Sequence, residues 1–414
     1  MTGSDAAATR WPPLGWAAFL GASWTWVIGM YLPILMIRDL GLAGYLVFAV
    51  PNVIGAAAMG WVLGSPEASR RLVDRHRNAC VAFSVVTIGY HLYWVTWLGG
   101  WAIGQWSVGA PALIAAAVLG AGVVAGARTV KRGGPARVCA LAAMLASLSA
   151  MLGFLFADPP AGPPVADRIR DVGFTADALW MLPVSTLGFA LCPYLDLTFN
   201  RARQACRSPA DSRLAFGLGF GVCFALMIVF TMLYAGPMIG FVDGSGGQGV
   251  VIPLTVAVAL GAHVALQWVF TVSVHTHEVA SAGVKSTPWG PAAVVLCVIA
   301  GAFVASIADQ RWFDMAPGEV GYRVLLSFYG LIFPAYVWLN VIDTKRRAMR
   351  TATARSLTVT AATIVLASPF YFAGFMLREE HWLIVGFGIV MLAKAAAGPP
   401  AMTQDHAADP APSG

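Results

Sequence analysis

Apolar residues run along the chain in long stretches, separated by short segments rich in arginine, proline and glycine. A helix needs about 20 mostly apolar residues to cross a bilayer. The pattern therefore predicts an all-α protein with twelve membrane spans, numbered here in chain order. They cover residues 14–37, 42–64, 79–100, 108–129, 137–157, 174–200, 213–237, 250–275, 290–308, 321–342, 356–376 and 382–398.

Composition narrows the class further. Hydrophobic residues make up 58% of the 414 residues and charged residues only 11%, whereas about 25% is usual for a soluble domain. The chain is therefore predicted to be a polytopic membrane protein whose main partner is the lipid bilayer. The net charge of +6 does not indicate nucleic-acid binding, because most basic residues lie in the loops between spans. The six cysteines lie in or beside apolar segments, so no disulfide framework is predicted.

The basic residues predict the orientation of the chain. Taking every second loop as cytoplasmic places most of the 26 Lys and Arg residues on one side, as the positive-inside rule requires. Both termini are then cytoplasmic, and we expect the protein in the cell's inner membrane. The basic residues on the predicted inner side are Arg10, Arg70, Arg71, Arg75, Arg77, Arg128, Lys131, Arg132, Arg137, Arg201, Arg203, Arg207, Arg213, Lys285, Lys345, Arg346, Arg347, Arg350, Arg355 and Lys394.

Spans 1 and 6 combine glycine, proline and small polar residues within apolar sequence. Proline removes a backbone hydrogen bond and glycine eases departure from helical geometry. Freed backbone groups are tolerated at membrane depth where they line a cavity. Two interrupted spans at matching places in two halves indicate a transporter binding site, although small residues can also serve close helix packing. The predicted breaks lie at Gly21–Thr25 and at Ser185–Gly188.

Five spans separate the two interrupted helices, so the halves would enter the membrane from opposite faces. This predicts a 5+5 inverted repeat followed by two extra helices. The predicted divisions are a cytoplasmic N-terminus (1–13), a first repeat (14–157), an outer linker (158–173), a second repeat (174–342), two further spans (343–398) and a disordered tail (399–414).

The stretch "GASWTWVIGMYLPILMIRDLGLAGYLVFAVPNVIGAAAMGWVL" (21–63) resembles the opening of sodium:solute symporters. Those proteins belong to the LeuT-fold group of amino acid–polyamine–organocation transporters. The resemblance covers about the first two spans and parts of span 6 in residues, and the whole chain in its number of spans. It implies a substrate site between spans 1, 3, 6 and 8, near the two breaks. The predicted substrate contacts are Gly21, Ser23, Trp24, Thr25, Tyr90, His91, Ser185, Thr186, Gly188, His263 and Gln267.

Two of these contacts are histidines in the middle of spans. His91 lies in span 3 and His263 in span 8, which are equivalents under the repeat, so both would lie at similar depth beside the breaks. Imidazole titrates near neutral pH and suits proton coupling; hydrogen-bonded packing is the alternative. Gln267 follows His263 by four residues, hence on the same helix face, and could extend a polar lining with Tyr90 or Tyr93.

The resemblance also implies a sodium site that would use adjacent hydroxyls on span 8. Here the hydroxyls belong to Thr271 and Ser273, with a valine between them. Two positions apart on a helix, they point about 200° apart and cannot both face one ion. The candidate ion-coupling residues are therefore His263, Thr271 and Ser273, and the coupling ion is left open between H⁺ and Na⁺. No other cofactor and no metal site is predicted.

Asp196 is the acid in span 6. It precedes Asn200, Arg201 and Arg203 on the predicted cytoplasmic side. One interpretation is an inner-gate carboxylate that exchanges its arginine partner during a transport cycle. The other is a static acid at a helix N-terminus, stabilised by the helix dipole.

These features favour a secondary transporter that carries a small neutral or zwitterionic solute by alternating access. The spans contain no nucleophile with an acid–base set, so the protein is not predicted to be an enzyme. The alternative is a transporter-like membrane sensor or structural subunit that does not transport. The sequence does not specify the substrate, the direction of transport or the oligomeric state.

Overall fold

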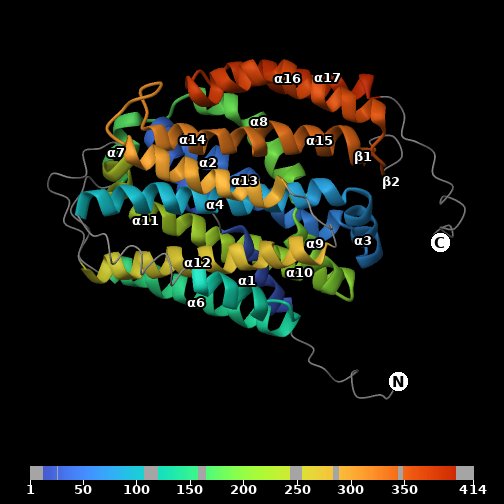
Figure 1. Cartoon of the computed structure of the whole chain (residues 1–414), viewed down its shortest axis with the longest axis horizontal. Helices are drawn as coiled ribbons and strands as arrows, with labels where there is room; N and C mark the ends of the chain where they lie inside the picture. Colours follow the sequence, from blue (N-terminus) through green and yellow to red (C-terminus); the bar gives the residue numbers. More distant parts are fainter. Residues whose placement is uncertain are drawn as a thin grey trace, which may run out of the picture.

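The computed structural model describes residues 13–25, 27–106, 120–156, 165–242, 254–282, 289–343 and 348–397. Between loops this part of the chain is helical, except for a two-stranded antiparallel sheet of β1 (Ile342–Asp343) and β2 (Ala348–Met349). The long helices run side by side along the long axis of the molecule (Figure 1). The predicted all-α character is confirmed.

The first half of the chain contains α1 (Pro13–Trp24), α2 (Val27–Val62), α3 (Pro66–Arg75), α4 (Arg77–Trp106), helical residues 120–129, and α6 (Gly133–Phe156). A short helix, α7 (Val165–Val172), lies in the connection. The second half contains α8 (Asp177–Leu191), η2 (Cys192–Tyr194), α9 (Leu197–Ala205), α10 (Pro209–Leu218), η3 (Gly219–Phe224), α11 (Ala225–Val242), α12 (Leu254–Ser281), α13 (Trp289–Ser306), α14 (Pro317–Ser327), η4 (Phe328–Ile332) and α15 (Phe333–Asn340). The chain then forms α16 (Ala354–Met376) and α17 (Trp382–Ala396), which pack against each other along one edge (Figure 1).

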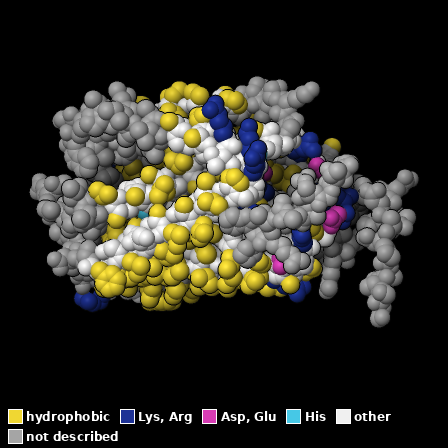
Figure 2. All heavy atoms as spheres, turned by 90° about the horizontal axis from the view of Figure 1, so that it is seen from below, with side chains coloured by type: hydrophobic (Ala, Val, Ile, Leu, Met, Phe, Trp, Pro, Cys, Tyr) yellow, Lys and Arg dark blue, Asp and Glu magenta, His cyan; other side chains and the backbone are white. Residues whose placement is uncertain are grey.

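Within the described ranges, eight helices are long and apolar enough to cross a membrane, or nine if the bent pair α8–α9 is one span. Many large apolar side chains on them are exposed, among them Ile299 at 59% and Val365 at 70%. Apolar exposure on this scale marks contact with lipid rather than water. Figure 2 shows hydrophobic side chains over the middle of the molecule, with most of the visible Lys and Arg toward one end. The chain is a multi-pass membrane protein.

Several predictions fall on residues outside the described ranges. These are most of span 4, the N-terminal segment up to residue 12 and the tail from residue 398. The count of twelve spans is therefore still a prediction. The connection between the predicted halves contains α7, although we expected only an exposed linker there.

Gly41 divides α2 into two helical segments that correspond to the end of span 1 and to span 2. Its backbone has φ 59° and ψ −149°, a conformation that side chains other than glycine rarely adopt. A Cβ atom here would lie 2.6 Å from the carbonyl oxygen of Gly173, at the end of α7. The turn between the two segments therefore requires glycine for both its conformation and its packing.

Candidate functional site

The discontinuity in span 1 begins at Thr25. Helix α1 ends at Trp24 and α2 begins at Val27. The Thr25 hydroxyl donates to the carbonyl oxygen of Gly21 at 2.7 Å, and the Trp24 indole N–H donates to Asn52 Oδ1 at 2.7 Å. The bond from the Thr25 side chain to the backbone competes with continuation of the helix. Gly21 itself is helical, so it lies one turn before the break.

The prediction that span 6 breaks at Ser185–Gly188 is wrong. Helix α8 is continuous through these residues to Leu191. The chain then forms the 3₁₀ turn η2, passes Leu195, and begins α9 at Leu197, with a bend of 57° between the two helical parts. The break therefore lies at residues 192–196, where Pro193 interrupts the helical pattern.

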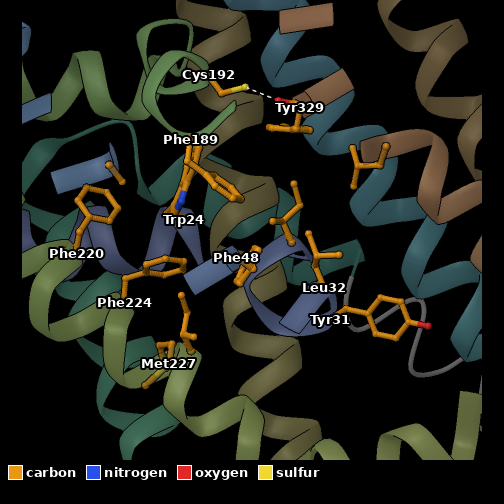
Figure 3. Packing of buried hydrophobic residues seen from close by; sticks show 14 of the residues in the cluster. Trp24, Tyr31, Leu32, Phe48, Phe189, Cys192, Phe220, Phe224, Met227 and Tyr329 are labelled. Carbon is orange, nitrogen blue, oxygen red and sulfur yellow. Dashed lines mark hydrogen bonds between the residues drawn. The ribbon is translucent and has the colours of Figure 1, made fainter. Parts of the chain in front are cut away.

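The residues of the mistaken break serve helix packing instead. The Ser185 hydroxyl donates to the carbonyl oxygen of Val47 at 2.8 Å. A Cβ atom on Gly188 would lie 2.7 Å from the carbonyl oxygen of Tyr329, so glycine allows α8 to approach η4. Thr186 is exposed on the outer face of α8. The Cys192 thiol also donates to the Tyr329 carbonyl oxygen, at 3.4 Å (Figure 3).

The two breaks meet in the interior of the protein. The hydroxyls of Ser23, near the end of α1, and Thr198, in the first turn of α9, are hydrogen bonded at 3.2 Å. Beside them the rings of Trp24 and Phe199 pack edge to face, with centroids 4.9 Å apart. The two discontinuous helices therefore touch where each is interrupted.

Asp196 is the N-cap residue of α9. Its Oδ1 accepts hydrogen bonds from the Thr198 backbone N–H and from the Thr198 hydroxyl, both at 2.7 Å. Arg201 donates to Glu278 at 2.9 Å, and Arg203 donates to the carbonyl oxygens of Gly64 and Cys206. In this conformation Asp196 caps α9, and the arginines considered as gate partners bind other acceptors.

His91 and His263 have different surroundings. His91 Nδ1 lies 2.7 Å from the carbonyl oxygen of Thr87, on its own helix. His263 Nδ1 lies 2.8 Å from the Ser147 hydroxyl on α6, and its ring packs on Phe230. Gln267 donates to the same Ser147 hydroxyl at 3.0 Å. Gln267 and His263 therefore share a helix face, but their common partner is Ser147 rather than Tyr90 or Tyr93.

The hydroxyls of span 8 point in different directions, as their spacing requires. Thr271 donates to the carbonyl oxygen of Ala22, in the last turn of α1, at 3.3 Å. Ser273 donates to the carbonyl oxygen of Val123, in the helical segment 120–129, at 3.2 Å. Of the two, only Thr271 contacts the last turn of α1, just before the break in span 1.

A cavity of about 60 Å³ lies between α2, α8, α14, η4 and α16. One water needs roughly 10–15 Å³ of such space, so the cavity could hold only a few waters in this conformation. Of the predicted contacts, Ser185 and Gly188 line it, and the histidines do not. The lining residues are Ile28, Leu32, Met36, Val47, Phe48, Met181, Val184, Ser185, Gly188, Phe189, Leu326, Tyr329, Gly330 and Phe375.

A buried ionic cluster joins α2 to α14, and we did not predict it. Arg38 donates to both oxygens of Glu319, at 2.7 and 2.8 Å, and to Asp39 at 2.7 Å. Arg323 donates to Glu319 at 2.8 Å and to Asp39 at 2.5 Å. The sequence signal was present, since Arg38 adjoins an acid and Glu319 precedes Arg323 by four residues. The sequence did not indicate that the pair Arg38–Asp39 contacts the pair Glu319–Arg323.

Comparison with known proteins assigns no family. No protein-family model matches the chain, and no curated protein matches it. A crystal structure of the Eremococcus coleocola manganese transporter, in complex with an aromatic bis-isothiourea substituted compound, aligns over 93% of each chain with a TM-score of 0.49 and 10% sequence identity. A likeness of this degree assigns neither a family nor a function.

Proposed function

We propose that the protein is a secondary active transporter that carries a small neutral or zwitterionic solute by alternating access, driven by a proton or sodium gradient. The observation that carries this proposal is the contact between the two interrupted helices at Ser23 and Thr198. Interrupted helices expose backbone N–H and C=O groups and helix-dipole ends at membrane depth. A zwitterionic solute can be bound by these groups without a fixed charged side chain.

We propose twelve spans, arranged as a LeuT-fold 5+5 inverted repeat and two extra helices. Helix packing supports this arrangement, because a contact between two spans has a counterpart between the two spans that the repeat relates to them. Helix α1 packs against α6, which is a contact between spans 1 and 5. Helix α8 packs against α15, which is the equivalent contact between spans 6 and 10. Helix α4 packs along α13, which is a contact between spans 3 and 9. Helix α12 packs against the segment 120–129 through Val269 and Gly122, which is the equivalent contact between spans 8 and 4.

Polar contacts at both ends support two gates. At one end the ionic cluster of Arg38, Asp39, Glu319 and Arg323 holds α2 to α14. Toward the other end Arg201 and Glu278 join α9 to α12. An alternating-access cycle would open these contacts in turn. We place the first on the outer side and the second on the cytoplasmic side of the inner membrane, with both chain termini in the cytoplasm.

The test is uptake by purified protein in liposomes. A mixed panel of small metabolites is supplied outside, with an imposed proton gradient, an imposed sodium gradient or neither, and the lumen is assayed by mass spectrometry. We expect one solute class to accumulate under one gradient only. Protein-free liposomes are the control.

The alternative function is a sensor or structural subunit built on a transporter scaffold. The divergence of Thr271 and Ser273 favours it, because a paired-hydroxyl ion site is then missing from span 8. Saturable binding of a panel solute, with no uptake under either gradient, would decide for the sensor and against the transporter.

A further inference from the structure

Asp196 has one carboxylate oxygen in use and one without a partner. Oδ1 accepts two hydrogen bonds from Thr198, whereas Oδ2 has no hydrogen-bond partner. The residue is fully buried, at 0% exposure. Capping of α9 needs only the first oxygen, so the helix cap does not explain the second.

The groups that face Asp196 provide no cation. The titratable side chains that interact electrostatically with Asp196 are Cys80 on α4, Cys192 in η2, Tyr329 in η4 and Glu278 on α12. The Ser23 hydroxyl on α1 is linked to it through Thr198. None of these side chains carries a positive charge, and Glu278 is itself an acid bonded to Arg201. Over the described ranges, no Lys or Arg forms an ion pair with Asp196.

An unpaired buried carboxylate is costly, so the charge must be neutralised by a proton or by a bound cation. A hard metal ion needs several oxygen ligands, and the side-chain hydroxyls at hand beside Asp196 are those of Ser23 and Thr198. In the described part of the chain, no group of three His, Cys, Asp or Glu could hold a metal. A proton needs only the one free oxygen.

We propose that Asp196 Oδ2 binds and releases the coupling proton of the transport cycle. This inference rests on the proposed function. The O–H bond forms at Oδ2 with a proton taken from water on one side of the membrane. It breaks when that proton returns to water on the other side, and no other reactant is required. Because Asp196 caps α9 and Thr198 contacts Ser23, the change in charge occurs where the two interrupted helices meet.

The test is infrared spectroscopy of the protein in liposomes during a pH titration, which detects the carbonyl stretch of a protonated carboxylic acid without any solute. The wild-type protein should show such a band that disappears reversibly as pH rises. Asp196→Asn should lose this component while keeping the helix cap, since asparagine caps as well as aspartate. If Asp196→Asn does not fold, Asp196→Ser provides a second capping variant without a carboxyl group.

Two control variants make the assignment specific. Glu278→Gln removes the acid that interacts electrostatically with Asp196, and Glu380→Gln removes another buried carboxyl, whose pKa is raised to about 7; both should retain the Asp196 component of the band. The same band in Asp196→Asn as in wild type would overturn the proposal. So would loss of the band on adding sodium at constant pH, because Asp196 would then be a sodium site.

The infrared result is independent of transport. A titrating band with no uptake of any solute would refute the proposed function and leave the proton site intact. Uptake driven by a proton gradient in Asp196→Asn, at the wild-type rate, would refute the proton site and leave the transporter.

Discussion

Thr198 and Ser23 are hydrogen bonded through their hydroxyls at 3.2 Å, although they lie 175 positions apart in the chain. This contact holds the first turn of α9 against the last turn of α1. It is the most direct evidence that the two interrupted helices meet, and it can be tested by crosslinking.

A Ser23→Cys/Thr198→Cys pair should form a disulfide under mild oxidation, because the two side-chain atoms already lie close together. Oxidation should stop solute uptake, and reduction should restore it. Peptide mass spectrometry identifies the bond in a background without the native cysteines, and each single cysteine variant is the control. No disulfide after oxidation, in a folded protein, would show that the two breaks do not touch.

Glu319→Ala should destabilise the protein, because it removes one of the two acids that Arg38 and Arg323 share and leaves both buried arginines on Asp39. Breaking a buried ion pair in this way costs about 3–5 kcal/mol. The midpoint of thermal unfolding in detergent measures the effect. Glu67→Ala, which removes an exposed pair with Arg70, should change the midpoint little. Equal midpoints for the two variants would contradict a structural role of the cluster.

Gly188→Ala should destabilise the contact between α8 and η4, because the added Cβ would lie 2.7 Å from the Tyr329 carbonyl oxygen. Overpacking of this kind costs about 1–3 kcal/mol. Gly153→Ala on α6 is the matched control, since a Cβ there has nothing within 4 Å. Thermal unfolding of both variants checks the difference, and an unchanged midpoint for Gly188→Ala would argue against the close approach.

Glu380, between α16 and α17, should make stability depend on pH. Burial raises the pKa of its carboxyl to about 7. Between the ordinary carboxyl pKa and about 7 the folded protein therefore binds a proton that the unfolded chain does not bind. Stability is gained as pH falls through about 7 and is lost as pH rises.

Glu380→Gln should remove this contribution, because glutamine does not titrate. Thermal midpoints of the variant should vary less with pH than those of the wild type, from acidic to mildly alkaline buffer. Parallel pH profiles for the two proteins would contradict the assignment to Glu380.

The sequence allowed the membrane class, the all-α fold and an interruption in span 6 to be predicted, because long apolar stretches and proline act locally. The predicted position of that interruption was wrong. Small residues such as Ser185 and Gly188 occur both at helix breaks and where a neighbouring helix packs closely, and the sequence alone does not distinguish the two. The packing partner, Tyr329, lies far away in the chain. Helix α8 ends at Leu191, two residues before Pro193, and Asp196 caps the start of α9.

Long-range partners account for the other differences. His263 and Gln267 were correctly placed on one face, since that follows from helical periodicity. Their shared partner Ser147 could not be derived, because nothing local specifies which neighbouring helix that face meets. The same applies to Arg38 and Glu319, which are 281 positions apart.

The glycine turn in α2 has a mechanical consequence. Gly41 ends the segment that continues span 1, and it packs against the carbonyl oxygen of Gly173, which follows α7 in the connection to α8. The chain leaving the first interrupted helix and the chain entering the second are therefore in direct backbone contact at this end of the molecule. The two interrupted helices are therefore joined at two places, the contact of Ser23 with Thr198 and this turn, and we expect a tilt of either segment to displace the other.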